Sequence, residues 1–360
     1  MSKRIGIVTG GGDCPGLNAV IRAVAKAAAK RGWEAVGILG GYEGLLEPQR
    51  TIPLDYQALS GLLTRGGTIL GTANRGKFSA KVGHGESRAL PVELIHGVKA
   101  GMDKLGLYAL VTIGGDGSLS IAQQMHEGGI HLVGVPKTID NDLEGTMMTF
   151  GFDSAVACAT DALDRLHTTA ESHNRVMILE VMGRYAGWIA LYAGVSGGAD
   201  VILIPEIPFT FDSICAKIAE REKLGKKFTL ITVAEGAKEK GGGYVTAGDE
   251  KKTGEARLGG VGNVVASRIE KLTGKETRCC VLGHLQRGGS PTTFDRALCS
   301  MFGATAIELV AAGDFGKMVA FTGPQVGAIN ISEAVGKLKT VKLDGNLIRT
   351  ARALGISLGD

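Results

Sequence analysis

Two aspartates lie two positions apart in the short polar stretch Pro-Lys-Thr-Ile-Asp-Asn-Asp, where they are Asp140 and Asp142. One such carboxylate can accept the proton of an attacking hydroxyl, while the other supports a metal ion or orients the pair. Lys137 and Thr138 come just before them and can face a phosphoryl group in transfer. Taken alone, the stretch fits equally well an aspartate-rich turn that caps the next helix.

Two glycine-rich turns add phosphate chemistry. In Ile-Gly-Gly-Asp-Gly-Ser, ending at Ser118, the glycine amides suit phosphate oxygens and the carboxylate of Asp116 suits the accompanying Mg²⁺. Gly-Gly-Asp-Gly also occurs in NAD kinases and lipid kinases, so it indicates phosphoryl transfer from a nucleotide without identifying the acceptor. The other turn, residues 9–18, lacks the dinucleotide-binding and P-loop patterns. Its glycines fit either a phosphate-binding site at the start of a helix or simply a tight turn.

Basic residues beside other apolar runs suggest an anion site. Arg184 ends Glu-Val-Met-Gly-Arg and can neutralise charge that develops on phosphoryl oxygens. His284 and Arg287 lie together in Gly-His-Leu-Gln-Arg, and Arg175 and Arg278 each adjoin an apolar run. These last four residues near strand ends predict a sugar-phosphate site, because arginine binds phosphate through paired donors. Singly, each is also explained as a solvated or salt-bridged residue.

The elements that must position these residues alternate along the chain. Apolar, β-branched runs predict strands at Ile5–Val8, Glu34–Leu39, Tyr108–Ile113, His131–Val135, Val176–Val181, Val201–Ile204, Phe228–Val233 and Thr277–Gly283. Helical periodicity predicts helices at Leu17–Arg31, Leu119–Glu127, Ser154–Ala170, Trp188–Ala193, Phe211–Leu224 and Phe294–Ala312. Fully apolar strands joined by helices indicate parallel α/β layers, and the length of 360 residues suits two lobes with a cleft. Ala237–Gly262 is predicted to be a surface hairpin or a mobile loop.

Composition excludes several classes of function. Hydrophobic residues make up 44% of the chain, the net charge is +4, and no run of five Lys and Arg marks a nucleic-acid or lipid surface. The six cysteines have no disulfide or zinc spacing and are predicted to be buried, reduced thiols. The first residues resemble no signal peptide and no apolar stretch is long enough to span a bilayer, which predicts a cytoplasmic protein that binds neither membrane nor nucleic acid.

Four motifs, taken in their order along the chain, resemble those of the bacterial type of the 6-phosphofructokinase family. They are Gly-Gly-Asp-Gly-Ser, Pro-Lys-Thr-Ile-Asp-Asn-Asp, Glu-Val-Met-Gly-Arg and Gly-His-Leu-Gln-Arg-Gly-Gly-Ser-Pro. The resemblance spans nearly the whole chain. It implies two Rossmann-like, three-layer α/β lobes with mostly parallel sheets. We expect a larger, nucleotide-binding lobe of residues 1–151 and about 286–336, and a smaller, sugar-phosphate-binding lobe of about 152–285 and 337–360. The implied reaction is the glycolytic phosphorylation of fructose 6-phosphate at its 1-hydroxyl, giving fructose 1,6-bisphosphate.

The resemblance also implies roles for single residues. Asp142 matches the general base, Asp140 and Thr138 match residues that assist at the metal and phosphoryl group, and Arg184 matches the cation of the transition state. The implied fructose 6-phosphate site comprises Thr138, Asp140, Asp142, Arg175, Met182, Gly183, Arg184, Glu235, Arg278, His284 and Arg287. In the family, the counterparts of Arg175 and Arg278 reach the phosphate from a neighbouring subunit, which implies a homodimer or homotetramer.

The phosphoryl donor rests on further matches. The implied ATP site comprises Gly11, Tyr42, Arg75, Gly76, Asp116, Gly117 and Ser118, with Asp116 as the Mg²⁺ ligand. The loop around Arg75 departs in spacing from the short bacterial enzymes. Gly117 resembles the ATP-using members, whereas Lys137 resembles the pyrophosphate-using ones. We favour ATP because steric exclusion is harder to evade than one added cation; pyrophosphate is the alternative.

Regulation and rival functions complete the set of expectations. Arg22, Lys26 and Lys226 resemble the bacterial effector pocket, but Tyr56 replaces an arginine there, so we expect weak or altered control; an exposed helix face explains Arg22 and Lys26 equally well. An NAD or lipid kinase leaves the arginines unexplained. A non-catalytic sugar-phosphate or nucleotide sensor would keep the phosphate ligands and lose the base, and Asp142 argues against it.

Overall fold

The computed structural model describes residues 3–72, 76–78, 89–246 and 258–360. The chain divides into two compact units. The first unit comprises Met1–Ser154 and Arg287–Leu338, and the second comprises Ala155–Gln286 and Lys339–Asp360.

The first unit is built on a seven-stranded sheet with the order β11-β10-β5-β4-β1-β2-β3. Its strands are β1 (Arg4–Thr9), β2 (Glu34–Ile38), β3 (Thr51–Pro53), β4 (Ala109–Gly114), β5 (Leu132–Pro136), β10 (Lys317–Phe321) and β11 (Val326–Asn330). The pairs from β2 to β10 are parallel, and only the outer pairs β2–β3 and β10–β11 are antiparallel. The central strands β4 and β5 are buried throughout, as continuous apolar runs between two helical layers must be.

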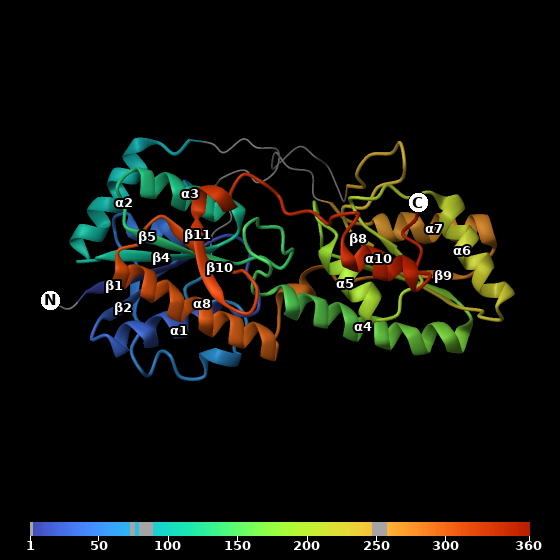
Figure 1. Ribbon diagram of the computed structural model, residues 1–360, viewed down its shortest axis with the longest axis horizontal. Helices are drawn as coiled ribbons and strands as arrows, with labels where there is room; N and C mark the ends of the chain where they lie inside the picture. The colour runs from blue at the N-terminus through green and yellow to red at the C-terminus, as the bar shows by residue number, and fades with distance from the viewer. Residues whose placement is uncertain (1–2, 73–75, 79–88, 247–257) are drawn as a thin grey trace. The chain divides into compact units, whose positions relative to one another are not determined.

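Helices cover both faces of this sheet. Helices α1 (Leu17–Lys30) and α8 (Thr293–Ala312) pack on each other along one face. Helices α2 (Val92–Lys104) and α3 (Asp116–Glu127) lie on the other, as Figure 1 shows, together with the short α9 (Ile331–Ala334). The arrangement is the three-layer sandwich that a right-handed crossover between parallel strands produces. It leaves the carboxyl ends of β1, β4 and β5 at one edge of the sheet.

The second unit has a four-stranded, wholly parallel sheet with the order β7-β8-β6-β9. Its elements are α4 (Phe152–His173, which starts in the first unit), β6 (Val176–Val181), α5 (Trp188–Ser196), β7 (Val201–Leu203), α6 (Phe211–Lys223), β8 (Thr229–Ala234), α7 (Val261–Thr273), β9 (Thr277–Val281) and α10 (Asn346–Ala353). Alternate residues of β6 face opposite layers: Ile178 joins the core under α6 and α7, whereas Met177 packs with Ala170 of α4.

The predicted α/β class with mostly parallel strands is confirmed, and each predicted strand and helix has a counterpart within a few residues. The prediction missed α2, α7, α9, α10, β3, β10 and β11. Of these, β3, β10 and β11 belong to the antiparallel edges, where short strands follow no crossover pattern. The end of the predicted loop is also wrong, because Val261 already begins α7. Thr246 and Leu258 form an antiparallel bridge, and residues 247–257 lie outside the described part.

The cysteines are free, as predicted, but not uniformly buried. Cys14 and Cys299 are buried, whereas Cys280 is exposed on β9. That strand is an edge of the second sheet and most of its residues are at least partly exposed, so it is not enclosed as the prediction of burial assumed.

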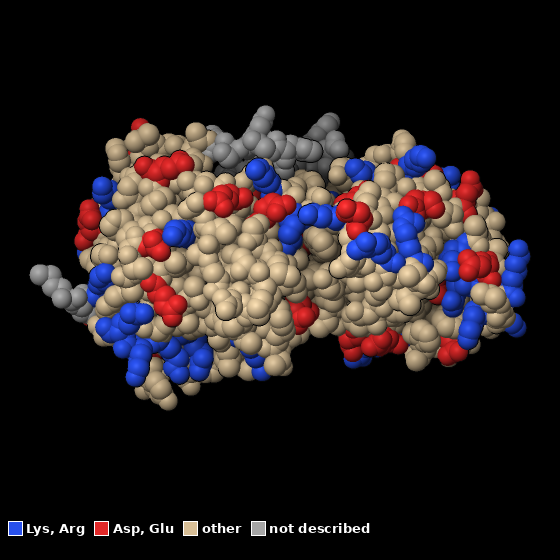
Figure 2. Space-filling view, in the orientation of Figure 1, with Lys and Arg blue, Asp and Glu red and all other residues tan. Residues whose placement is uncertain are grey.

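Surface features agree with the composition. On the face of the second unit seen in Figure 2, Lys and Arg side chains are interspersed with Asp and Glu. Among the described helices, none combines the length and apolar character needed to cross a membrane.

Candidate active site

Three turns meet at the carboxyl edge of the first sheet, because β1, β4 and β5 are parallel neighbours. This is the edge where open α/β sheets bind their ligands. The turn after β1 holds Gly10 to Asp13, the turn after β4 leads into α3 at Asp116, and the turn after β5 holds Lys137 to Asp142. The structure therefore brings together three motifs that are far apart in the sequence.

The turn after β5 is shaped by Asn141. This residue has a φ of 50°, in the left-handed region that asparagine tolerates better than most residues. Its buried side chain accepts a hydrogen bond from Thr149 N at 3.0 Å and donates to Met147 O at 3.3 Å. The Thr149 hydroxyl in turn donates to Thr138 O at 2.6 Å. The backbone that carries the flanking aspartates, Asp140 and Asp142, is thus fixed by these hydrogen bonds.

Electrostatics set Asp142 apart from an ordinary surface carboxylate. Its pKa is raised from 3.8 to about 7, mainly by burial and then by the negative charge of Asp140, while a hydrogen bond from Thr138 acts in the opposite direction. Although its surroundings desolvate the carboxylate, the residue as a whole keeps partial exposure to solvent, so a ligand can reach it. A carboxylate whose pKa lies near neutral pH is suited to accept and return a proton.

Lys137 is buried, and its ammonium donates to the Gly12 carbonyl at 2.5 Å. Burial lowers the pKa of this lysine. A β-carbon at Gly11 would lie 3.2 Å from Lys137 Nζ and 3.4 Å from Ser118 Oγ, so these three predicted donor-site residues are close neighbours. Gly11 has a φ of 77°, which a side chain would rarely adopt.

Asp116 is the first residue of α3, where a negative charge is favourable to the helix. Its Oδ1 accepts a hydrogen bond from Gly336 N at 2.9 Å, and burial raises its pKa. Gly117 and Ser118 follow on the same turn and are half-buried. Among the described residues no group of three or more His, Cys, Asp and Glu forms a metal cage.

The other predicted donor-site residues belong to the segment after β2. Tyr42 is buried, its hydroxyl hydrogen-bonds the Thr112 hydroxyl at 2.9 Å, and burial raises its pKa. The Tyr42 hydroxyl is therefore part of the core. Gly76 adopts a φ of 123° beside Glu43, whose carboxylate would lie 2.1 Å from a β-carbon at Gly76. Arg75 lies outside the described residues.

Arg287 opens the returning segment of the first unit. Its guanidinium donates to Asp13 O at 3.1 Å, and a β-carbon at Gly12 would lie 2.7 Å from its Nη1. Together with Lys137, it places two cations on successive carbonyls of the turn after β1.

In the second unit, Met182, Gly183 and Arg184 follow the carboxyl end of β6. Gly183 has a φ of 138° and its carbonyl accepts from Gly236 N at 3.2 Å. A β-carbon at Gly236 would lie 2.0 Å from Arg184 O, so only glycine allows this approach. The Arg184 guanidinium lies 5.2 Å from the centre of the Tyr185 ring.

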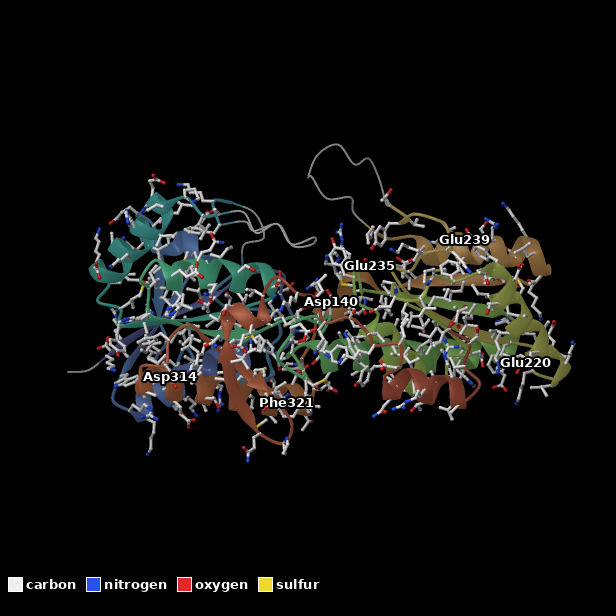
Figure 3. The ribbon with its side chains drawn as sticks, turned by 45° about the horizontal axis from the view of Figure 1, so that its top comes forward. Asp140, Glu220, Glu235, Glu239, Asp314 and Phe321 are labelled. Carbon is white, nitrogen blue, oxygen red and sulfur yellow. The ribbon has the colours of Figure 1, made fainter. Side chains whose placement is uncertain are left out.

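Glu235 follows β8 at the same edge, and its amide donates to Val181 O at 2.9 Å. In Figure 3 this residue lies at the opposite end of the second unit from Glu220 of α6. The same view shows Asp140 and Asp314 at opposite ends of the first unit, as expected for residues after β5 and before β10, which are parallel. His284 is exposed on a 3₁₀ turn, Gly283–Arg287, that follows β9.

The four basic or donor residues predicted near strand ends do not all lie at the same edge of the second sheet. Arg175 precedes β6 and Arg278 lies near the start of β9, at the amino edge of the sheet, whereas His284 follows its carboxyl edge. Arg175 and Arg278 instead share one carboxylate, that of Glu276, each at 2.6 Å. The apolar runs revealed that these arginines adjoin strands but not at which end each side chain projects.

Two acidic residues that accept hydrogen bonds from backbone amides were not singled out from the sequence. Asp295 is buried, accepts hydrogen bonds from Gly151 N and from the amide and hydroxyl of Ser154, and has a pKa raised to about 6 by burial. Glu206 accepts from Gly187 N and Val341 N. Neither lies in a glycine-rich motif; a charged residue directly after an apolar strand, as in Pro205-Glu206, was the available signal for the second.

The positions compared with an effector pocket are not distinguished by their contacts. Arg22 is half-buried and Lys26 exposed on α1, and Lys226 is exposed after α6. Tyr56 is 83% exposed. The alternative of a solvated helix face for Arg22 and Lys26 stays open.

Residues 4–310 match the sequence pattern of the family described as phosphofructokinase. The chain belongs to the phosphofructokinase family. It is 52% identical over 358 residues to a protein of Chloroflexus aurantiacus named ATP-dependent 6-phosphofructokinase, covering 99% of this chain and 98% of the relative. A Streptomyces coelicolor protein named pyrophosphate–fructose 6-phosphate 1-phosphotransferase is 48% identical over 341 residues, covering 94% of this chain and 96% of the relative.

A solved phosphofructokinase structure supports the fold. The structure of phosphofructokinase from Saccharomyces cerevisiae matches with a TM-score of 0.80 at 30% identity. The match covers 92% of this chain but 45% of the yeast chain, so this family member spans less than half of that relative. The phosphofructokinase fold inferred from the motifs is therefore confirmed.

Proposed function

We propose that the protein is an ATP-dependent 6-phosphofructokinase, a phosphotransferase that phosphorylates fructose 6-phosphate at the 1-hydroxyl. The relative from Chloroflexus aurantiacus has this name and aligns with this chain over nearly its full length, which supports the proposal. In this proposal the first unit binds the nucleotide and the second binds the sugar phosphate, and the pathway is glycolysis.

The observation that supports the proposal most directly is the raised pKa of the Asp142 carboxyl group. Its pKa of about 7, set by burial and by Asp140, suits a base that takes the proton of the 1-hydroxyl as the phosphoryl group arrives. Thr138 hydrogen-bonds this carboxylate and also accepts from Asp140 N at 3.1 Å, which fixes both groups. A sensor that only bound sugar phosphate would have no use for a carboxylate tuned in this way.

Mg²⁺ fits the donor set. Magnesium is usually held by one or two carboxylates together with substrate phosphates, so the lack of a larger cage among the described residues is compatible with it. Asp116 is the residue that would hold it, with Asp140 in support. When bound, the ion neutralises charge on the phosphates. The turn amides at Gly11, Gly117 and Ser118 bind phosphate oxygens.

The remaining assignments follow the family motifs. Arg184 stabilises charge on the transferring phosphoryl group, Met182 and Gly183 shape the sugar site, and Glu235 accepts a hydrogen bond from a sugar hydroxyl. His284 and Arg287 bind the sugar phosphate. Tyr42, Arg75 and Gly76 belong to the nucleotide site.

Pyrophosphate is the second candidate donor, and Lys137 is the residue that favours it. A relative of nearly the same identity is named a pyrophosphate-using enzyme. The ammonium of Lys137, however, is bonded to the Gly12 carbonyl. Gly117 leaves room for a nucleotide, so we place ATP first.

A direct assay decides between the donors. Purified protein is given fructose 6-phosphate and Mg²⁺ with either ATP or pyrophosphate, and fructose 1,6-bisphosphate is measured. We expect product with ATP. Product with pyrophosphate alone would reject ATP as the donor, and product with neither would reject the function.

Self-association is proposed on the same basis. Arg175 and Arg278 lie at the amino edge of the second sheet, and we propose that they serve the sugar phosphate of a neighbouring copy in a homodimer or homotetramer. The exposed edge strand β9 supports this, since Val281 is 47% exposed and Leu285, just beyond the strand, 68%. Sedimentation at several protein concentrations tests the assembly.

We further propose a cytoplasmic location and no nucleic-acid or membrane partner. Control by effectors is expected to be weak, because Tyr56 is exposed and carries no charge that would help hold a phosphate. Initial rates at subsaturating fructose 6-phosphate, with and without ADP or phosphoenolpyruvate, measure this; a strong response contradicts the expectation.

A further inference from the structure

A second-unit carboxylate with no role in the proposed function lies against the turn that carries Arg184. Glu206 follows the carboxyl end of β7. Both of its oxygens accept from the Gly187 amide, at 3.0 and 3.1 Å. Gly187 ends the turn that begins at Gly183 and is the residue that precedes α5.

The approach of Glu206 depends on Gly187 being glycine. A β-carbon there would lie 2.4 Å from Ile204 Cβ and 3.0 Å from Glu206 Oε2. The carboxylate therefore reaches a backbone amide that any other residue would shield. Hydrogen bonds to an ionised acceptor are about twice as strong as those to a neutral one.

Glu206 also holds the segment that returns to the second unit. Its Oε1 accepts from Val341 N at 2.8 Å, and the Trp188 indole donates to Lys339 O at 2.8 Å. Residues 339–341 and the start of α5 are thus bound together through this half-buried carboxylate and through the Trp188 indole. Burial raises the pKa of this group, and its bonds to Val341 and Gly187 act against that rise.

The Arg184 turn is consequently fixed at both ends. At one end the Gly183 carbonyl accepts from Gly236 N, and at the other the Gly187 amide donates to Glu206. We propose that Glu206 is a positioning residue for Arg184, acting through the Gly187 amide. The proposal rests on the role given to Arg184 in the proposed function.

The test compares Glu206→Ala with Asp200→Ala in the purified, full-length protein. Asp200 is a matched control at the amino end of β7: it is half-buried, accepts from Leu230 N at 2.9 Å and pairs with Arg221. We expect Glu206→Ala to lower kcat by about 10- to 100-fold, as small misplacements of catalytic groups do, with KM for both substrates changed less than about twofold. Asp200→Ala should lower the melting temperature and leave kcat unchanged.

Two further variants separate positioning from general damage. In Glu206→Gln a carbonyl at the Oε1 position still accepts from Gly187 and Val341, but the amide nitrogen at the Oε2 position cannot accept from Gly187, so kcat should lie between those of Glu206→Ala and the parent. In a double-mutant cycle with Arg184→Lys, adding Glu206→Ala should cost much less than it does alone.

The outcomes distinguish a failure of the role given to Arg184 from a failure of the positioning role given to Glu206. If Arg184→Lys has full activity, the role of Arg184 in the proposed function fails. A second case is that Arg184→Lys is impaired while Glu206→Ala behaves like Asp200→Ala, or the effect of Glu206→Ala adds fully to that of Arg184→Lys. In that case the positioning role of Glu206 is wrong and the proposed function stands.

Discussion

The two units place polar groups in the same way, after the carboxyl ends of parallel strands, but they hold different groups there and by different contacts. In both, parallel strands end at one edge, and the next turn carries the polar side chains. In the first unit these include the carboxylates of Asp116, Asp140 and Asp142; in the second they include the guanidinium of Arg184. The way the groups are held also differs. The Asn141 side chain supports the turn of the first, whereas close backbone contact at Gly236, together with the Glu206 carboxylate, supports the turn of the second.

The difference teaches which kind of change each edge tolerates. The pKa of Asp142 depends on neighbouring side chains, so chemistry at the first edge is sensitive to charge and burial. The placement of Arg184 also depends on the close backbone approach at Gly236, so chemistry at the second edge is in addition sensitive to added volume. Each prediction below acts on one side of this contrast.

The largest effect is expected from Asp142→Ser. Removing a general base lowers kcat by about 10³- to 10⁴-fold, while the affinity for fructose 6-phosphate changes little, because the base acts in the transition state. Turnover is followed by product formation and affinity by calorimetry. Undiminished kcat would contradict the assignment of the base.

Gly236→Ala tests the second edge. The new methyl group would lie 2.0 Å from Arg184 O, so the turn must shift. We expect kcat to fall by about 10- to 100-fold and stability by about 1–3 kcal/mol. Gly243→Ala is the matched control, since a β-carbon there meets no atom within 4 Å. At the first edge, Gly115→Ala should have a smaller effect, because its nearest contact is Lys137 O at 3.1 Å.

The pH profile tests the charge side of the contrast. Asp142 must be ionised to act as a base, and its pKa is about 7. The kcat/KM for fructose 6-phosphate should therefore rise about tenfold per pH unit below that value and level off above it. A profile that is flat from pH 5 to pH 8 would contradict the raised pKa.

The smallest effect concerns stability. Because the pKa of Asp142 is raised in the folded protein, keeping this carboxylate ionised opposes folding; the penalty is absent below pH 3.8 and grows up to about pH 7. Asp142→Asn should therefore raise the free energy of unfolding at pH 8, and raise it much less at pH 4. Asp103→Asn, at an exposed position of α2, serves as the control. Denaturant unfolding at both pH values measures the difference.

The sequence by itself determined the layers and the catalytic motifs. Apolar runs and helical periods are local properties, so β1, β4, β5, β6 and β8 were predictable, as was the turn after each. Type and spacing also singled out Asp142, Lys137 and Arg184 as groups with chemistry. Edge strands such as β3 and β11 were missed, because their stability comes from pairing with β2 and β10 rather than from their own composition.

Only the tertiary structure decided how these groups are held and charged. The pKa of Asp142 depends on burial and on Asp140, the ammonium of Lys137 is bonded to a carbonyl more than a hundred residues away in sequence, and Glu206 reaches Gly187 across the end of a strand. Arg175 and Arg278 adjoin strands in the sequence, but only strand direction shows that they lie at the amino edge of their sheet. The burial of a charged side chain and its contacts with distant parts of the chain cannot be read from its own residue type, so they emerge only once the chain is folded.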